Sequence, residues 1–115
     1  MEATAHLRHL RMAPRKVALV ATLVRGKPVG DALNILRFTK KAAARPLSKL
    51  IKSAVANATD KSKGQVDVDA LVIKHISVDQ AQTQRRYMPR AMGRATPIHK
   101  KTSHVHVTLA EGKRK

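Results

Sequence analysis

Six histidines and seven acidic residues are the side chains of this 115-residue sequence that could bind a metal ion or transfer protons. His104 and His106 alternate with apolar residues, so their imidazoles are predicted to share one face of a strand, and His75 could lie across from them. A closed zinc site needs four ligands, and no neighbouring carboxylate or thiol clearly completes such a set. The pattern favours histidines with a structural or nucleic-acid-contacting role over a metal site.

The sequence lacks the arrangements that make a catalytic centre or hold a cofactor. It has no cysteine, which excludes disulfides, thiolate ligands and a thiol nucleophile. It contains no G-x-S-x-G motif, no P-loop and no G-x-G-x-x-G motif. Asp67 and Asp69 could form an acid pair, but they fall in a turn beside basic residues and are expected at the surface. We therefore expect no enzymatic activity, no cofactor and no small-molecule substrate.

The basic residues carry the strongest functional signal. Lys and Arg number 24 against 7 Asp and Glu, which gives a formal net charge of +17, and residues 3–30 and 80–110 contain no acid. Solvated faces normally mix both signs, so these two windows indicate a surface for a polyanion, with nucleic acid ahead of an anionic membrane. Only Phe38 and Tyr87 are aromatic, which excludes modules that stack several bases on aromatic side chains. Recognition through phosphates and shape remains.

Hydrophobic periodicity predicts three helices in one small domain with an aliphatic core. Pro14 suits the first position of a helix, an apolar stripe from Val17 to Val24 follows it, and Gly26 ends it. Pro46 is tolerable only near a helix start, so the third helix is expected to begin late in its range. The predicted helices cover residues 14–25, 28–38 and 41–59.

Three segments alternate as strands do. They cover residues 2–10, 70–78 and 103–109, and the second is the richest in β-branched residues. The apolar parity of the second strand shifts from odd to even positions near Lys74 and His75. This shift predicts a β-bulge there, or a strand covered partly on both faces.

Residues 80–101 join the last two strands but do not resemble core. They contain Pro89, Gly93 and Pro97, six basic residues and few apolar ones. A structureless loop of this length is rare in a small domain. The alternative is that the flanking strands continue outward as a long β-hairpin arm, reaching about 30–35 Å at roughly 3.3 Å per residue. A two-stranded ribbon is marginal alone in water, so the arm is expected to need a phosphate-rich partner.

Six segments occur in the order and spacing of one protein family. They are residues 10–17 (Leu-Arg-Met-Ala-Pro-Arg-Lys-Val), 24–27 (Val-Arg-Gly-Lys), 32–36 (Ala-Leu-Asn-Ile-Leu), 53–58 (Ser-Ala-Val-Ala-Asn-Ala), 88–95 (Met-Pro-Arg-Ala-Met-Gly-Arg-Ala) and 102–105 (Thr-Ser-His-Val). Over essentially its whole length the sequence resembles the bacterial large-subunit ribosomal proteins numbered twenty-two in the L series. The resemblance implies an α+β fold, with three helices packed on a small antiparallel sheet and a long protruding β-hairpin.

The resemblance also implies a function. Residues 1–115 would form a single RNA-binding domain that binds large-subunit ribosomal RNA and supports early assembly. The arm of residues 80–101 would line the nascent-peptide exit tunnel, in contact with neighbouring ribosomal proteins and the nascent polypeptide, and macrolides would bind nearby. The residues implied to bind ribosomal RNA are Arg8, Arg11, Arg15, Lys16, Arg25, Lys27, Arg90, Arg94, Lys100, Lys101 and His104. The residues implied to lie at the tunnel-facing tip are Gln84, Arg85, Arg86, Tyr87, Met92 and Gly93.

Two positions depart from the family's usual pattern. Ala13 stands where a serine usually precedes the helix, so the first helix is expected to lack a side-chain N-cap. Met92 stands where a lysine is usual, which removes one cation near the tip of the arm.

Two other classes of function stay open on the residues alone. A DNA-binding architectural protein could also use a basic β-arm, with Met88 and Pro89 as an apolar wedge. A membrane-surface or antimicrobial-like protein is less favoured, because no helix pairs an aromatic-rich face with a lysine face. The N-terminus lacks the layout of a signal peptide, and no apolar run approaches the roughly 18 residues of a membrane span. We therefore expect a cytoplasmic location, within the ribosome if the resemblance holds.

Overall fold

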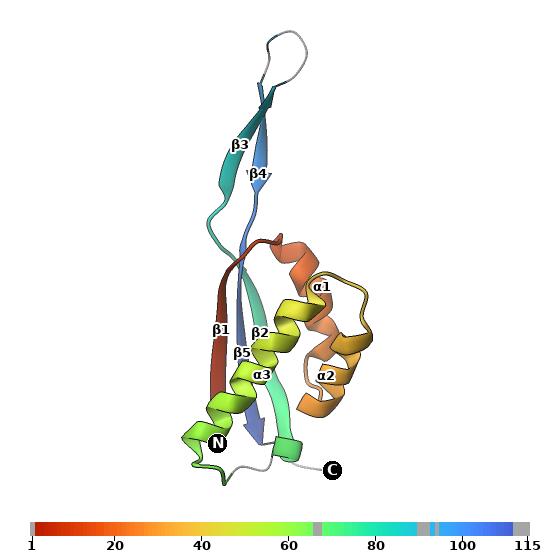
Figure 1. The fold of residues 1–115 in the computed structure, drawn as a ribbon, viewed down its shortest axis with the longest axis vertical. Helices are drawn as coiled ribbons and strands as arrows, with labels where there is room; N and C mark the ends of the chain where they lie inside the picture. Colours follow the sequence, from red (N-terminus) through yellow and green to blue (C-terminus); the bar gives the residue numbers. More distant parts are fainter. Residues whose placement is uncertain (1, 66–67, 90–92, 94, 112–115) are drawn as a thin grey trace.

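The computed structural model describes residues 2–65, 68–89, 93 and 95–111, with the backbone alone for residues 84–89 and 95–99. Along the chain, one strand is followed by three helices and then by four strands (Figure 1). They are β1 (Glu2–Leu10), α1 (Pro14–Val24), α2 (Val29–Phe38), α3 (Ala44–Lys61), a 3₁₀ turn η1 (Val68–Ala70), β2 (Leu71–Gln80), β3 (Gln84–Pro89), β4 (Ala95–Lys100) and β5 (Ser103–Glu111).

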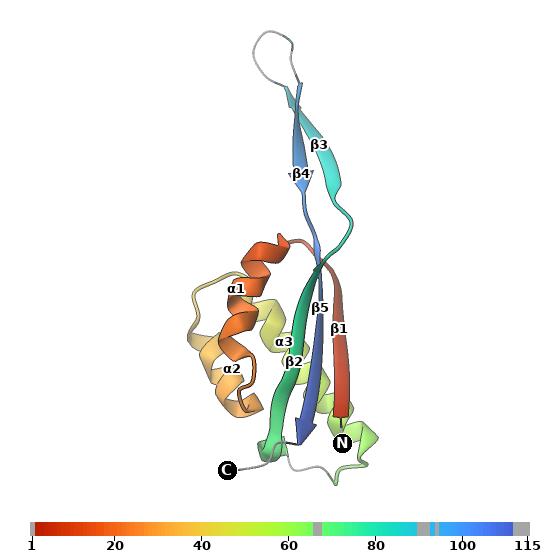
Figure 2. The same cartoon turned by 180° about the vertical axis from the view of Figure 1, so that it is seen from behind.

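Three strands form the main sheet, in the order β1-β5-β2, and both pairings are antiparallel. The helices α1, α2 and α3 cover one face of this sheet, and none of the three lies on the opposite face (Figures 1 and 2). The strands β3 and β4 pair as a separate two-stranded ribbon that projects from the end of the sheet. The predicted α+β fold with a protruding hairpin is confirmed.

The core lies between the helices and the covered face of the sheet. Along β5 the residues Val105, Val107 and Leu109 are fully buried and alternate with half-buried ones, as expected of a strand with one covered face. The longest helix, α3, contributes a buried stripe that includes Leu47, Ile51, Ala54 and Ala58. The small residues Ala54 and Ala58 in this stripe let the helix pack closely against the sheet.

The helix boundaries follow the local sequence signals. Pro14 is the first residue of α1, and Ala13 precedes it in an extended conformation with no side-chain cap. Gly26, at φ +76°, leads the chain away from the end of α1, a conformation that glycine adopts at little cost. The third helix begins at Ala44, so that Pro46 falls in its first turn as predicted.

The sheet contains two register shifts. One lies between Ile73 and His75 of β2 and confirms the predicted bulge. The other lies between Leu7 and Leu10 of β1 and was not predicted, because the alternation of residues 2–10 is weak. Within this second bulge His9 has a φ of +57°.

The arm joins the main sheet through a short neck. Residues 81–83 separate β2 from β3, and residues 101 and 102 separate β4 from β5. The amide of Ala81 donates a hydrogen bond of 2.9 Å to the carbonyl of Thr102. Thr102 is 7% exposed, and its hydroxyl donates a hydrogen bond of 2.7 Å to the carbonyl of Gln82. Beyond the neck β3 and β4 pair in register, and the whole molecule measures 65 × 25 × 17 Å.

Candidate nucleic-acid interface

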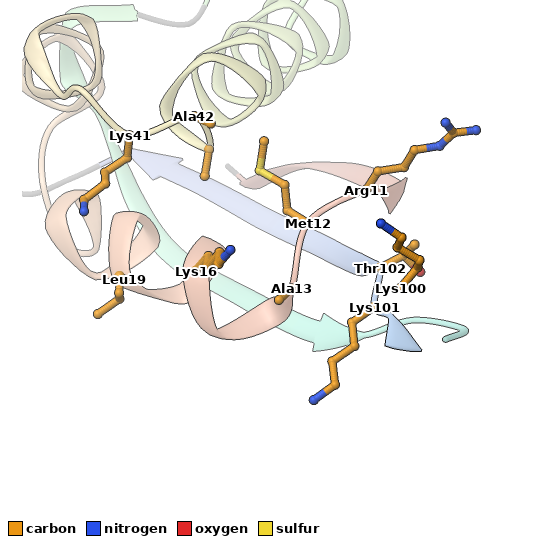
Figure 3. Close-up of a pocket in the computed structure, with 11 residues that line it drawn as sticks. Arg11, Met12, Ala13, Lys16, Leu19, Lys41, Ala42, Lys100, Lys101 and Thr102 are labelled. Carbon is orange, nitrogen blue, oxygen red and sulfur yellow. The ribbon is translucent and has the colours of Figure 1, made fainter. Parts of the chain in front are cut away.

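A hollow of about 860 Å³ lies where the start of α1, the loop before α3 and the base of the arm meet (Figure 3). Five of its eleven lining residues are basic and none is acidic. The basic residues are Arg11, Lys16, Lys41, Lys100 and Lys101. We call this hollow the neck cleft.

The turn from β1 to α1 forms one side of the neck cleft. The amide of Met12 donates to the carbonyl of Leu10 at 2.8 Å. The hydroxyl of Ser103, which is fully buried on β5, donates to the carbonyl of Met12 at 2.6 Å. A buried serine therefore fixes the turn that carries Arg11 and leads to Lys16.

The other sides come from the loop before α3 and from the chain that returns from the arm. The amide of Ala44 donates to the carbonyl of Lys41 at 3.1 Å, which ties this lysine to the first turn of α3. Lys100 ends β4, where it pairs with Gln84, and Lys101 follows it, next to the buried Thr102. Residues far apart in the sequence thus meet at one place.

The electrostatics of the neck cleft suit an anion with several charges. All five cations are exposed, so they remain hydrated and free to reach outward. The first turns of α1 and α3 contain no acid and have no side-chain cap, and their preceding residues Ala13 and Ala43 line the cleft. The positive ends of both helices therefore add to the field of the cations. A chain of phosphates would relieve their mutual repulsion through charge-assisted hydrogen bonds.

Sequence reasoning found four of the five cations. Arg11, Lys16, Lys100 and Lys101 were predicted to bind RNA, and the structure brings them together although the arm separates them in sequence. Lys41 was not predicted, because periodicity assigned it to the start of a helix and gave no sign of the fold-back toward α1. Of the other predicted contacts, Arg8 and Arg15 are exposed but do not line the cleft.

Two further predicted contacts lie at the opposite end of α1. The guanidinium Nη2 of Arg25 donates to the carbonyl of Ile76 at 3.0 Å. The amide of Gly26 donates to the carbonyl of Ile73, and the amide of Ile73 donates to the carbonyl of Lys27. This loop therefore covers the outer edge of β2, and an RNA contact of Arg25 or Lys27 would be separate from the neck cleft.

The register of the arm corrects the position of the predicted tip. Gln84 pairs with Lys100 at the base of the ribbon, and Tyr87 pairs with Pro97 at its middle. The residues Gln84, Arg85, Arg86 and Tyr87 therefore lie along the ribbon, and the turn follows Pro89. Gly93, at φ +71°, belongs to the turn. Arg90, Met92 and Arg94 lie outside the described residues.

Histidines form two cross-strand pairs on the open face of the sheet. The Nδ1 atoms of His6 and His106 are 2.5 Å apart. The Nδ1 atom of His104 accepts a hydrogen bond of 3.1 Å from the amide of His9. The partners thus come from β1, whereas His75, which was predicted to lie across from His104 and His106, faces Thr108. Among residues with described positions, no group of three or more potential ligands could hold a metal ion.

One acidic residue on this face has a perturbed pKa. The carboxylate of Glu2 accepts a hydrogen bond from Lys74, which reaches it from β2 across the central strand. This hydrogen bond and the charge of Lys74 hold the pKa of Glu2 below its usual value of 4.5. Glu2 is therefore neutralised by its own partner and adds little negative charge to the open face.

Comparison with known proteins identifies the family. Residues 5–110 match the family described as "Ribosomal protein L22p/L17e". The chain belongs to this family. It is similar to the "Large ribosomal subunit protein uL22" of Myxococcus xanthus (strain DK1622), with 76% identity over 99% of this chain and 100% of the relative. It is similar to the protein of the same name from Geobacter sulfurreducens, with 54% identity over 96% of this chain and 98% of the relative.

Membership of the family has direct consequences. This L22p/L17e chain is a ribosomal protein of the large subunit and not an enzyme. The predicted location, in the cytoplasm as part of the ribosome, follows from the family. Within the described ranges, no helix is long and apolar enough to cross a membrane. The alternatives of a DNA-binding architectural protein and a membrane-surface protein are set aside.

Proposed function

We propose that the neck cleft binds the phosphate backbone of large-subunit ribosomal RNA. The observation that carries this proposal is that five basic residues and no acidic one line a single hollow at the base of the arm. Lysine and arginine side chains that neutralise phosphates supply affinity without reading sequence. Such a contact fixes the position and orientation of the protein on its RNA and would support subunit assembly. Arg8, Arg15, Arg25, Lys27, Arg90, Arg94 and His104 are proposed as further contacts.

The arm is proposed to line the nascent-peptide exit tunnel. Its length supports this role, because the ribbon extends away from the domain while the neck cleft holds the domain on RNA. Gln84, Arg85, Arg86 and Tyr87 would then face the tunnel along the ribbon, and Met92 and Gly93 near its turn. The nascent polypeptide and neighbouring large-subunit proteins would be its partners there, and macrolides would bind nearby.

Salt-dependent binding tests the role of the neck cleft. We expect the affinity for transcribed large-subunit RNA to fall with log salt at a slope of about −4 to −5 if about six phosphates are neutralised. Replacing Lys16 and Lys101 together by glutamine removes two cleft cations. The slope should then become shallower by about 1.5, since each phosphate contact contributes roughly 0.7–0.9.

The matched control replaces Lys52 and Lys63 by glutamine. Both are exposed residues that do not line the neck cleft, so this variant has the same net charge as the cleft variant. We expect its slope to stay close to that of the unmodified chain. If both variants weaken binding equally, net charge alone drives the interaction and the cleft is not a site. A flat response to salt in the unmodified chain would refute binding through phosphates altogether.

A further inference from the structure

The β-bulge in β1, between Leu7 and Leu10, interrupts the regular pairing of this strand with β5. Arg8 and His9 together face the single residue His104 of β5, the two-against-one arrangement of a β-bulge. His9 has a φ of +57°, a left-handed conformation that is uncommon for residues other than glycine and costs free energy. A contact to His9 that offsets this cost would stabilise the bulge.

His104 supplies such a contact. Its Nδ1 atom accepts a hydrogen bond of 3.1 Å from the backbone amide of His9, and the two rings meet edge-on with centroids 4.8 Å apart. A backbone amide can only donate, so Nδ1 of His104 must be unprotonated and the ring proton of the neutral form lies on Nε2. A second proton on the ring would occupy Nδ1 and remove the acceptor.

The bulge leads directly into the neck cleft. Two residues after His9, the chain reaches Arg11, which lines the cleft. Next to His104 on β5, the hydroxyl of Ser103 holds the carbonyl of Met12. Adjacent residues of β5 thus fix both ends of the segment that carries Arg11. Bulges commonly serve to redirect a side chain in this way.

We propose that His104 is a positioning residue for RNA binding. With Nδ1 unprotonated, His104 holds the bulge that places Arg11 at the neck cleft. Protonation of Nδ1 releases the bulge and weakens the binding of phosphates in the cleft. This inference rests on the proposed function of the neck cleft. It assigns to His104 a role inside the protein, and a direct contact of the same ring with RNA would have to use Nε2.

Other titratable groups lie near His104, and their effects on RNA binding must be distinguished from the effect of His104. From β2, Asp79 lies opposite His104 in the sheet register, and its Oδ2 atom is 3.3 Å from Nε2 of His106. His106 lies on the same face of β5 and contacts His6 of β1. From β1, Arg8 and His9 form the bulge itself. A pH effect on the whole protein between pH 5 and 8 could therefore not by itself be assigned to His104.

Substitution by asparagine isolates His104. The side-chain oxygen of asparagine occupies nearly the position of Nδ1 and accepts a hydrogen bond, but it does not titrate in this range. His104→Leu fills similar space and offers no acceptor. All other titratable groups are common to the three proteins, so a difference between them belongs to this position.

Amide exchange of His9 in the full chain is the structural readout. At pH 8 we expect this amide to be protected in the unmodified chain and in His104→Asn, and to exchange at least about tenfold faster in His104→Leu. At pH 5.5, after correction for intrinsic exchange, the unmodified chain should lose this protection and His104→Asn should keep it. Equal protection of His9 in the unmodified chain and His104→Asn at both pH values would overturn the proposal, even if His104→Leu does not fold.

Affinity for transcribed large-subunit RNA is the functional readout. We expect the affinity of the unmodified chain, divided by that of His104→Asn, to fall about threefold to tenfold between pH 8 and pH 5.5, whatever its value at pH 8. Replacing Arg11 by glutamine should abolish this change, because the effect acts through Arg11. A constant ratio of affinities across pH would overturn the positioning role while leaving cleft binding intact. Loss of salt-dependent binding in every protein would instead refute the proposed function.

Discussion

The first turn of α1 begins at a residue whose side chain cannot cap it. Ala13 has the extended conformation of an N-cap residue, with φ −64° and ψ 138°, but makes no side-chain cap bond. Ala13→Ser places a hydroxyl that can accept from a backbone amide of the first turn, and we expect it to raise the free energy of unfolding by about 1 kcal/mol. Thermal or denaturant unfolding measures this change.

A matched control separates capping from the chemistry of serine. Ala56→Ser introduces the same side chain at an exposed position in the interior of α3. Serine has a lower helix propensity than alanine, so this variant should be slightly less stable than the unmodified chain. A destabilised Ala13→Ser variant would show that the N-terminus of α1 is not limited by its missing cap.

Individual basic residues show which parts of the interface the sequence alone could predict. Lys100 and Lys101 could be assigned to the interface because they lie in a window without acids. Lys41 also lies in an acid-free window, residues 32–59, but its place in the cleft could not be predicted, because it depends on the loop before α3 folding back beside the start of α1. Arg25 is also basic and also lies in an acid-free window, yet its guanidinium donates to the carbonyl of Ile76. Charge patterns predict a surface, but the tertiary fold decides which cations share it.

At the scale of elements, the hydroxyl of Thr102 makes one of the hydrogen bonds that hold the neck between the two sheets. Thr102→Val keeps the shape of the side chain and removes its hydrogen bond to the carbonyl of Gln82. We expect the free energy of unfolding to fall by about 1 kcal/mol, because a carbonyl loses its partner. Amide exchange at Ala81, which donates to the carbonyl of Thr102, should become faster.

Thr108→Val on the same strand is the control for this change. Its side chain is half-buried on the open face of the sheet, away from the neck. We expect its stability to change by no more than about 0.5 kcal/mol and the exchange of Ala81 to stay the same. Equal effects of the two substitutions would mean that the hydrogen bond of Thr102 does not specifically stabilise the neck.

The elements themselves were largely predictable. Apolar stripes and proline positions located the three helices, and the parity shift near Lys74 located the bulge in β2, because both signals are local. The bulge in β1 was missed because its cause is distant: His9 is held by His104, 95 positions away in sequence. Interactions between strands that are remote in sequence do not change the periodicity of apolar residues, so they cannot be predicted from it.

At the scale of the whole molecule, the described hydrophobic core and the arm occupy different parts of the sequence. The buried hydrophobic residues among the described side chains all lie outside residues 82–100. Replacing residues 82–100 by an Asn-Gly turn, which suits a two-residue hairpin, should therefore leave a protein that unfolds cooperatively. Differential scanning calorimetry measures this. A truncated chain without a cooperative transition would show that the arm belongs to the core.

The central claim is that the neck cleft holds ribosomal RNA. Crosslinking in intact large subunits, mapped to both residue and nucleotide, tests it most directly. We predict crosslinks from Arg11, Lys16, Lys41, Lys100 and Lys101 to one contiguous segment of large-subunit RNA, including Lys41, which the structure alone assigns to the cleft. Crosslinks from these residues only to neighbouring proteins, or to RNA segments that cannot meet in one cleft, would contradict the account.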